Sequence, residues 1–375
     1  MKILLTGGGT GGHFYPVIAV AQSLRKYTRE KKLLDIELFY MAPEPYNQTL
    51  LDDLTIKFVQ IPAGKRRTYF SILNYTDIFK TGFGILKAVW KMFWMYPDVV
   101  FSKGGYVSFP VVVAATFLRI PIVIHESDSV PGRANSWAGK IAQRIAISYP
   151  QAVDHFQKEK VALTGNPIRQ EVIHAAKEGA HEFLELENNV PLVVILGGSQ
   201  GSQLINESIL NILPKLVEKY QVIHQVGKAN YKSVEETAGV VLFENENKNR
   251  YKMYDTLNDL ALRMAAGAAD IIISRAGSTI FEIAVWGVPS ILVPITDSNG
   301  DHQRKNAYSY SRTGAAVVIE ENNLTGNILF SEIDRMLHDA PLRENMKKAA
   351  LEFGHVNAAD LIASEILGIA LQHER

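Results

Sequence analysis

The chain opens with Met1-Lys2-Ile3-Leu4-Leu5-Thr6-Gly7-Gly8-Gly9-Thr10-Gly11-Gly12-His13. The apolar run Lys2–Leu5 predicts a buried strand, and the residues from Pro16 to Lys26 have the spacing of a helix. A glycine loop between a strand and a helix exposes backbone N–H groups and the positive end of the helix dipole, and both favour a ligand that carries phosphate. This opening therefore predicts the start of a Rossmann-like domain.

The alternation of strands and helices continues along the first half of the chain. It predicts strands at Ile36–Met41, Lys57–Ile61, Val99–Phe101, Ile122–Ile124 and Arg144–Ile147, and helices at Ser71–Met95 and Trp137–Ile141. The order begins again with the strand Pro191–Leu196, the loop Gly197-Gly198-Ser199-Gln200-Gly201, a helix from about Gln203, and strands at Val222–Gln225, Ile271–Ser274, Ser290–Val293 and Ala316–Ile319. Such alternation indicates parallel sheets with helices on both faces. We therefore predict an α/β protein with two Rossmann-like domains and a boundary near Thr164.

The composition narrows the class of protein. A length of 375 residues exceeds one ordinary core and agrees with two domains. Lys plus Arg and Asp plus Glu both number 39, so the net charge is zero and nucleic acid is not an expected partner. The absence of cysteine excludes disulfides, thiolate zinc sites and cysteine nucleophiles. The apolar run at the start is too short for a signal peptide, so export is not expected.

The longest apolar stretch runs from Tyr106 to Ile124. Pro110, Arg119 and Pro121 interrupt it, which is unlike a membrane span. Both prolines lie where an element would begin, and proline is tolerated there. We therefore expect a buried helix at Pro110–Leu118 and a buried strand at Pro121–Ile124.

The first glycine loop has two alternative interpretations in addition to a phosphate site. Gly7, Gly9 and Gly12 match G-x-G-x-x-G, which is typical of dinucleotide binding. That site also needs an acid at the end of the second strand, where this chain has Phe39-Tyr40-Met41-Ala42, so a nicotinamide oxidoreductase is disfavoured. A purely structural turn is the other alternative. His13 follows the last glycine and, as a neutral imidazole, could take a proton from a hydroxyl nucleophile, although a lone histidine there is also typical of a helix cap.

The second half carries a further set of polar residues at expected strand ends. Gly277-Ser278-Thr279 follows the strand Ile271–Ile273 and can present N–H groups and hydroxyls to a diphosphate. Glu282, one turn into the next helix, can accept the hydroxyls of a ribose, or simply complement the helix dipole. Asp301-His302-Gln303 follows another strand, where ligands of α/β proteins usually bind. A solvated loop is the alternative for this cluster.

Seven segments together resemble the MurG family of bacterial glycosyltransferases over essentially the whole chain. They are Gly7–His13, Gly104-Gly105-Tyr106-Val107-Ser108, His125-Glu126, Thr164-Gly165-Asn166-Pro167-Ile168-Arg169, Gly197-Gly198-Ser199-Gln200-Gly201, Arg275–Glu282 and Asp301-His302-Gln303. The resemblance implies a GT-B fold, in which two Rossmann-like domains with parallel sheets face a cleft. We expect an acceptor and membrane-side domain at 1–163, a UDP-sugar-binding domain at 164–342, and a C-terminal helix at 343–375 that returns to the first domain.

The resemblance also implies the reaction and its residues. Members of the family move N-acetylglucosamine from UDP-N-acetylglucosamine to O4 of the muramyl sugar of undecaprenyl-diphosphate-MurNAc-pentapeptide (lipid I), with inversion at the anomeric carbon. Matching positions imply donor contacts for Arg169, Ser199, Ser278, Thr279, Glu282 and Gln303, to which we add the cleft residue Asn135, and an acceptor and phosphate side at Thr10, Gly11, Gly12, His13 and Tyr106. His13 is the expected base.

Two positions depart from the family pattern. Ser127-Asp128 stands where Gln-Asn is often found, so Asp128 is a rival base to His13, and His302 stands where glutamine is common. No Asp-x-Asp sequence occurs, so no dedicated metal site is visible and no cofactor is required. Assistance to the diphosphate by a divalent cation such as Mg²⁺ stays open.

The segment between Ile61 and Pro97 mixes basic and aromatic residues. The basic residues are Lys65, Arg66, Arg67, Lys80, Lys87 and Lys91, and the apolar ones are Phe70, Ile72, Leu73, Phe79, Phe83, Leu86, Trp90, Phe93, Trp94 and Tyr96. This mixture suits peripheral docking on an anionic membrane surface, here the cytoplasmic face of the cell membrane, while core packing is the alternative.

Two other functions of the chain stay open as alternatives. One is a GT-B transferase for another lipid-linked acceptor, and the other is a UDP-sugar epimerase of the same architecture, which would need no lipid.

Overall fold

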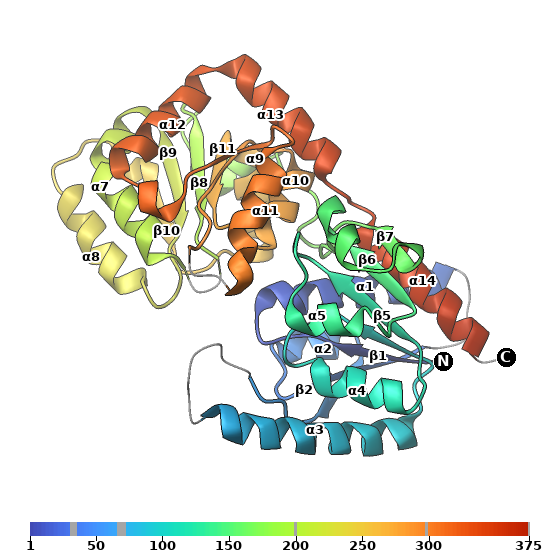
Figure 1. Ribbon diagram of the computed structural model, residues 1–375. Helices are drawn as coiled ribbons and strands as arrows, with labels where there is room; N and C mark the ends of the chain where they lie inside the picture. The colour runs from blue at the N-terminus through green and yellow to red at the C-terminus, as the bar shows by residue number, and fades with distance from the viewer. Residues whose placement is uncertain (31–35, 66–72, 199–200, 297–298, 374–375) are drawn as a thin grey trace. The chain divides into compact units, whose positions relative to one another are not determined.

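The computed structural model describes residues 1–30, 36–65, 73–198, 201–296 and 299–373, which form two compact units (Figure 1). Unit 1 comprises Met1–Arg169 and Val356–Arg375, and unit 2 comprises Gln170–His355. Each unit has its own parallel sheet, with helices on both faces. The chain is therefore an α/β protein with two Rossmann-like domains.

Unit 1 contains a seven-stranded sheet in the order β3-β2-β1-β4-β5-β6-β7. The strands are β1 (Lys2–Thr6), β2 (Glu37–Ala42), β3 (Ile56–Gln60), β4 (Val99–Ser102), β5 (Ile122–Glu126), β6 (Arg144–Ile147) and β7 (Val161–Leu163). The helices are α1 (Gly11–Glu30), α2 (Gln48–Asp53), α3 (Leu73–Met95), α4 (Phe109–Phe117), α5 (Arg133–Ala138) and α14 (Ala358–His373), with 3-10 turns at Pro150–His155 and Lys158–Lys160.

The central strand β1 shows why both faces of this sheet are covered. Its side chains alternate between the two faces, as they do in any strand. Ile3 packs in a core cluster with Ile366 of α14 and residues of α1, whereas Leu4 packs in another with Met92 of α3 and Val111 of α4. From Ile3 to Thr6 every residue of the strand is buried, which is typical of a strand in a doubly covered parallel sheet.

Unit 2 repeats this architecture with six parallel strands in the order β10-β9-β8-β11-β12-β13. The strands are β8 (Leu192–Leu196), β9 (Gln221–Gln225), β10 (Tyr251–Tyr254), β11 (Ile271–Ser274), β12 (Ser290–Leu292) and β13 (Ala316–Val318). The helices are α6 (Ala180–Phe183), α7 (Gln203–Lys219), α8 (Tyr231–Val241), α9 (Asp259–Ala268), α10 (Thr279–Trp286), α11 (His302–Ser311), α12 (Gly326–His338) and α13 (Ala340–Phe353), with 3-10 turns at Lys248–Arg250, Asn299–Asp301 and Glu321–Asn323.

The unit boundaries differ from those expected at 163/164 and 342/343. The segment from Thr164 stays with unit 1 because the Thr164 and Gly165 N–H groups donate to the carbonyl of Ile147, at 3.0 and 3.2 Å. The C-terminal helical run is two helices, of which α13 belongs to unit 2, where Phe353 stacks on Phe281 with ring centroids 5.8 Å apart. Only α14 packs on unit 1, alongside α1 (Figure 1).

The strands predicted from the sequence are present within two residues of their expected ends. Two edge strands, β7 and β10, were missed because they are only three and four residues long and partly exposed, which is too short for a clear strand pattern. The stretch from Tyr106 to Ile124 forms α4 and β5, as expected. Among the described residues, no helix has both the length and the apolar character needed to span a membrane.

Candidate active site

The predicted residues of unit 1 meet at the carboxyl ends of three neighbouring strands. Thr6 of β1 is in register with Ser102 of β4, and Ser102 with Ile124 of β5. The glycine loop, Lys103 and the segment that begins at His125 therefore leave the sheet at one edge. The order of the strands reverses between β1 and β4, and ligands of open α/β sheets bind at such a point.

The glycine loop is shaped by its contacts with two tyrosines. Gly9 has a φ of +90°, and a Cβ atom there would lie 2.9 Å from Cε1 of Tyr106, so this position requires glycine. The hydroxyl of Tyr40 donates to the carbonyl of Gly7. α1 begins directly after the loop, at Gly11, so its first N–H groups are available to an anion. Tyr106 thus lies against the loop that leads to Thr10, Gly11 and Gly12, and the acceptor-side role of these residues stays a prediction.

His13 lies in the first turn of α1 and is oriented by Thr10. Its Nδ1 is 3.0 Å from Oγ1 of Thr10, and its Nε2 faces Gly105, where a Cβ atom would be 3.7 Å away. Burial and then the ammonium of Lys103 lower the pKa of His13 to about 4, while Asp128 acts in the opposite direction. The imidazole is therefore neutral at physiological pH, which is the form that can accept a proton.

A buried acid, Glu126, organises the turn that carries Asp128. Its carboxylate accepts hydrogen bonds from the N–H of Asp128 at 2.9 Å, the N–H of Gly132 at 3.2 Å and Nδ2 of Asn135 at 3.0 Å. Burial and the neighbouring Asp128 raise the pKa of Glu126 to about 7, although Lys103 and these hydrogen bonds oppose the shift. Asp128, half-buried, is therefore one member of a carboxyl pair.

Two predicted donor-binding residues, Asn135 and Arg169, belong to unit 1. Asn135 is 5% exposed, and its Nδ2 also donates to the carbonyl of His125 at 3.0 Å, so its amide group supports the Glu126 turn. The guanidinium of Arg169 lies 4.3 Å from the ring centroid of Tyr15 in α1. Their predicted contact with the donor stays a prediction.

In unit 2, the remaining donor residues lie at the start of α10 and in the first turn of α11. Ser278 precedes α10 and its hydroxyl makes no capping bond to the helix, and Thr279 and Glu282 lie in the first turn. Oε1 of Gln303 accepts the N–H of Ile295 at 3.2 Å, which ties Gln303 to the end of β12. The predicted Ser199 lies outside the described residues.

The structure adds residues that the sequence did not single out. Lys103 is 1% exposed beside the acids of unit 1. In unit 2, Nη1 of Arg275 is 2.6 Å from Oε1 of Glu321, and Oε2 of Glu321 accepts the N–H of Thr296 at 2.8 Å. Lys103 directly precedes the segment Gly104–Ser108, and Arg275 is the first residue of the segment Arg275–Glu282. Their positions next to these segments were the only indication in the sequence that they belong to the site region.

Known proteins are similar to this chain over nearly its whole length. Residues 3–147 match the Glycosyltransferase family 28 N-terminal domain, and residues 192–362 match the Glycosyltransferase family 28 C-terminal domain. A relative from Clostridium botulinum is named UDP-N-acetylglucosamine--N-acetylmuramyl-(pentapeptide) pyrophosphoryl-undecaprenol N-acetylglucosamine transferase. It is 34% identical over 367 residues, which cover 96% of this chain and 98% of the relative.

Solved structures share the fold. MurG from Acinetobacter baumannii aligns with a TM-score of 0.72 and 23% identity, covering 98% of this chain and 99% of that chain. UDP-GlcNAc 2-epimerase from Neisseria meningitidis, bound to UDP-GlcNAc, aligns with a TM-score of 0.67 and 16% identity, covering 98% of this chain and 100% of that chain. Because one fold hosts both activities, the fold by itself does not decide between them.

Proposed function

Since the chain belongs to glycosyltransferase family 28, and within it to the MurG family, we propose that it makes lipid II for peptidoglycan synthesis. The reaction moves N-acetylglucosamine from UDP-N-acetylglucosamine to O4 of the muramyl sugar of undecaprenyl-diphosphate-MurNAc-pentapeptide. The configuration at the anomeric carbon inverts, as expected for a single displacement. The name of the Clostridium botulinum relative contains the same donor, acceptor and transferred group.

One observation within unit 1 favours a lipid-linked acceptor. A pocket of about 830 Å³ is lined both by Gly9 and Tyr106 of the glycine-loop region and by Lys80, Phe83 and Lys87 of α3. A molecule with a diphosphate and a long apolar tail suits this combination. The diphosphate would meet backbone N–H groups and lysines, and the tail would leave along the aromatic helix.

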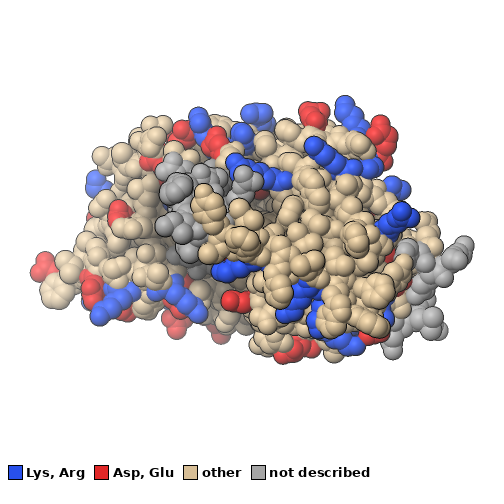
Figure 2. Space-filling view, turned by 60° about the horizontal axis from the view of Figure 1, so that its bottom comes forward, with Lys and Arg blue, Asp and Glu red and all other residues tan. Residues whose placement is uncertain are grey.

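The outer face of α3 supports docking on a membrane. Eight large apolar side chains of this helix are between 59% and 78% exposed: Tyr75, Ile78, Phe79, Phe83, Leu86, Trp90, Phe93 and Trp94. Figure 2 shows the molecule with the side that carries α3 turned forward. A broad area of this side consists of uncharged residues, drawn in tan, with basic side chains, drawn in blue, among them. Soluble proteins seldom expose apolar patches of this extent without a binding role. Arg66, Arg67, Phe70 and Ile72 lie outside the described residues.

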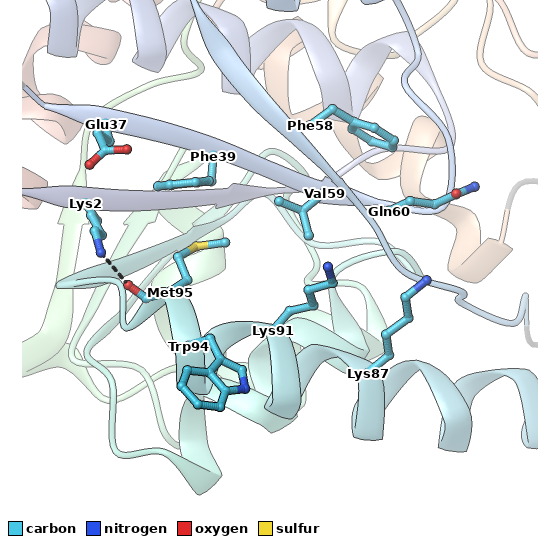
Figure 3. Close-up of a pocket in the computed structure, with 10 residues that line it drawn as sticks. All are labelled: Lys2, Glu37, Phe39, Phe58, Val59, Gln60, Lys87, Lys91, Trp94 and Met95. Carbon is cyan, nitrogen blue, oxygen red and sulfur yellow. Dashed lines mark hydrogen bonds between the residues drawn. The ribbon is translucent and has the colours of Figure 1, made fainter.

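Lysines on α3 supply the charge for an anionic surface. Figure 3 shows Lys87 and Lys91 extending from α3 towards Val59 and Gln60, in a pocket of about 530 Å³ that Trp94 also lines. Neighbouring Lys2 is already engaged, since its Nζ donates to the carbonyl of Met95 at 3.0 Å. The proposed location is therefore peripheral, on the cytoplasmic leaflet, where anionic headgroups attract such lysines.

His13 and Asp128 are the proposed acid–base residues. The neutral imidazole of His13 takes the proton of the acceptor hydroxyl as that oxygen attacks the anomeric carbon. Thr10 holds Nδ1, which leaves Nε2 for the proton. The negative charge of Asp128 raises the pKa of His13 and so stabilises the imidazolium that forms.

Unit 2 is the proposed donor side. Ser278 and Thr279, with the N-terminus of α10, hold the charge that develops on the departing UDP, and Glu282 accepts the ribose hydroxyls. Because the N-terminus of α10 would stabilise the negative charge on the departing UDP, a dedicated metal ion would be unnecessary and Mg²⁺ would be an optional aid. Activity that persists in excess EDTA is the expected result, and complete loss restored by Mg²⁺ would contradict it.

UDP release from UDP-N-acetylglucosamine, followed with and without the muramyl-pentapeptide diphosphoryl lipid, tests this function. Release that depends on the lipid, with the product carrying a new N-acetylglucosamine, is the expected result. Epimerised donor in the absence of lipid would establish the epimerase instead. UDP release only with a different lipid-linked sugar would confirm glycosyl transfer and show that the acceptor differs from the proposed one. The variant Glu282→Ala serves as the control for donor binding.

A further inference from the structure

A buried histidine of unit 2, His224, lies between two polar side chains from neighbouring elements. It belongs to β9 and is 0% exposed. Its Nε2 is 3.0 Å from Oδ1 of Asn206 in α7, and its Nδ1 is 3.0 Å from the hydroxyl of Tyr251, the first residue of β10. Burial lowers the pKa of His224 to about 3, so the imidazole is neutral at physiological pH. One of its ring nitrogens therefore carries a proton and the other accepts one.

The carbonyl of Val226 fixes the direction of these hydrogen bonds. A carbonyl can only accept, so the amide nitrogen Nδ2 of Asn206 faces it and donates, at 3.1 Å. The amide oxygen of Asn206 then faces His224, so Nε2 of the imidazole carries the proton. Nδ1 is left to accept from the hydroxyl of Tyr251. The three side chains and the carbonyl of Val226 thus form one continuous chain of hydrogen bonds, which we call the His224 network.

The inner end of the His224 network lies against the second glycine loop. The carbonyl of Val226 accepts a further hydrogen bond from Nδ2 of Asn230, at 3.0 Å, so both of its lone pairs are used. Gly201 has a φ of +74°, and a Cβ atom there would lie 2.1 Å from the oxygen of Val226. Only glycine allows the backbone to come this close. The position of this carbonyl therefore determines where the chain passes at Gly201.

Asn206 also connects the His224 network to the start of α7. It is 2% exposed and lies in the first turn of the helix, where its N–H donates to the carbonyl of Ser202 at 2.9 Å. The strand before this helix, β8, pairs with β9, and Leu196 is in register with Gln225. The chain therefore leaves both strands at the same edge of the sheet. Ligands of open α/β sheets bind at this carboxyl edge.

We propose that the His224 network positions the backbone for the donor: it holds the carbonyl of Val226, and through it Gly201, in the conformation that binds UDP. This inference rests on the proposed function, in which unit 2 is the donor side. His224, Asn206 and Tyr251 are then positioning residues, which act through Val226 without touching the donor. A fully satisfied buried network specifies one arrangement of the groups that it joins, whereas apolar side chains would leave the direction of the carbonyl undetermined.

The effect of a substitution should decrease with its distance along the network from Val226. Asn206→Leu removes the hydrogen bond to the carbonyl itself and should raise the Kd for UDP about tenfold. His224→Leu leaves the amide of Asn206 without its partner and should raise this Kd about fivefold, whereas His224→Gln can still direct an N–H towards Asn206 and should recover part of the loss. Tyr251→Phe removes only the outermost bond and should raise the Kd about twofold.

Calorimetric titration of the full chain with UDP measures these changes, and steady-state kinetics show whether they concern the donor alone. The KM for UDP-N-acetylglucosamine should rise with the Kd, while kcat and the KM for the lipid acceptor stay the same. Tyr220→Phe is the matched control, because the hydroxyl of Tyr220 bonds to Asp334 at 2.8 Å beyond the opposite end of α7. It should leave the Kd for UDP unchanged, which a general loosening of unit 2 would not do.

The outcomes separate this inference from the proposed function. An unchanged Kd for UDP in both Asn206→Leu and His224→Leu, or an equal rise in Tyr220→Phe, would overturn the inference while transfer by the wild type continued. Weaker UDP binding in the order given, without transfer to the muramyl-pentapeptide lipid, would support the inference and refute the proposed acceptor. A wild type that does not bind UDP would refute both. If circular dichroism shows that Asn206→Leu does not fold, His224→Gln and Tyr251→Phe decide the question by the same titration.

Discussion

Replacing Glu321 with glutamine should weaken unit 2 and its hold on the donor. Nη1 of Arg275 lies 2.6 Å from Oε1 of Glu321, and the two side chains are 14% and 18% exposed. Oε2 of Glu321 accepts the N–H of Thr296 at 2.8 Å, while Arg275 also donates to the carbonyl of Val293 at 3.1 Å. The pair thus joins the end of β11, the segment after β12 and the turn after β13.

The size of the effect follows from the burial of the pair. Glutamine has nearly the same shape as glutamate but no charge. The guanidinium of Arg275 would therefore keep its hydrogen bond to the carbonyl of Val293 and lose its ion pair with the carboxylate. Breaking a fully buried ion pair costs about 3–5 kcal/mol and an exposed one about 0–1 kcal/mol, and this pair lies between the two, so we expect about 2 kcal/mol. The N–H of Thr296 also loses a charged acceptor.

The donor should bind more weakly because the same segment holds Gln303. Its Oε1 accepts the N–H of Ile295, which adjoins Thr296, at 3.2 Å. A displacement that costs about 1.4 kcal/mol of donor binding corresponds to a tenfold rise in KM for UDP-N-acetylglucosamine. The KM for the lipid acceptor should stay the same, since the acceptor residues belong to unit 1.

Urea denaturation, with hydrogen exchange of the β11 and β12 amides, measures the loss of stability. Burial acts to raise the pKa of Glu321, but the hydrogen bond from Thr296 and the charge of Arg275 outweigh it and hold the pKa below its ordinary value. The carboxylate therefore stabilises unit 2 fully above its unfolded pKa of about 4.3, and this contribution disappears as the pH falls through the lower folded value. The difference in the free energy of unfolding between the wild type and Glu321→Gln should therefore become smaller as the pH falls over that range.

The neighbouring acid provides the control. Glu320 bonds to Arg304, which is 51% exposed, so Glu320→Gln should change stability and donor KM far less. The reasoning fails if Glu321→Gln unfolds at the same urea concentration as the wild type, or if it raises the KM of the acceptor rather than that of the donor.

Three further outcomes are expected. Thr10→Val removes the bond to Nδ1 of His13, which is worth about 1 kcal/mol, so kcat should fall roughly fivefold at unchanged donor KM in steady-state assays. Ile366→Ala empties a fully buried position of α14 and should lower the free energy of unfolding by about 2–5 kcal/mol in urea titrations. Phe83→Glu should reduce sedimentation with anionic vesicles, whereas Phe243→Glu, at an even more exposed aromatic in unit 2, should leave it unchanged; equal loss would refute docking through α3.

The sequence predicted the fold well where strands are central and apolar. β6 and β11 have the expected ends because, apart from exposed Arg144, their residues are buried on both faces. The repeated order of strand, glycine loop and helix identified both units. Its errors lie where local patterns carry no information about partners. Phe353 is helical in either interpretation, and tertiary contacts such as its stacking on Phe281 and the packing of Met346 in the core of unit 2 assign α13 to that unit.

The sequence offered candidate residues for the site but no information about the charges around them. Motifs identified His13, Tyr106 and the first turn of α10, because glycine loops and strand ends can be read locally. Lys103 was missed since nothing in its neighbours shows which acids the next strand brings beside it. The donor contact predicted for Asn135 stays a prediction. Its Nδ2 donates to the carbonyl of His125 and to Glu126, contacts that depend on tertiary structure.

The ionisation of His13 links these charges to the reaction. The sequence set His13 and Asp128 as rival bases, yet their electrostatics suit a shared role. A base with a pKa of about 4 is neutral in the cell but holds a proton weakly, so it needs help once the proton arrives. Asp128 gives that help because its charge favours the imidazolium, whereas burial, and after it the charge of Lys103, lowers the pKa of His13. Asp128→Asn should therefore lower kcat without abolishing it, whereas His13→Ala should remove the base itself; a larger loss in Asp128→Asn would reverse the assignment.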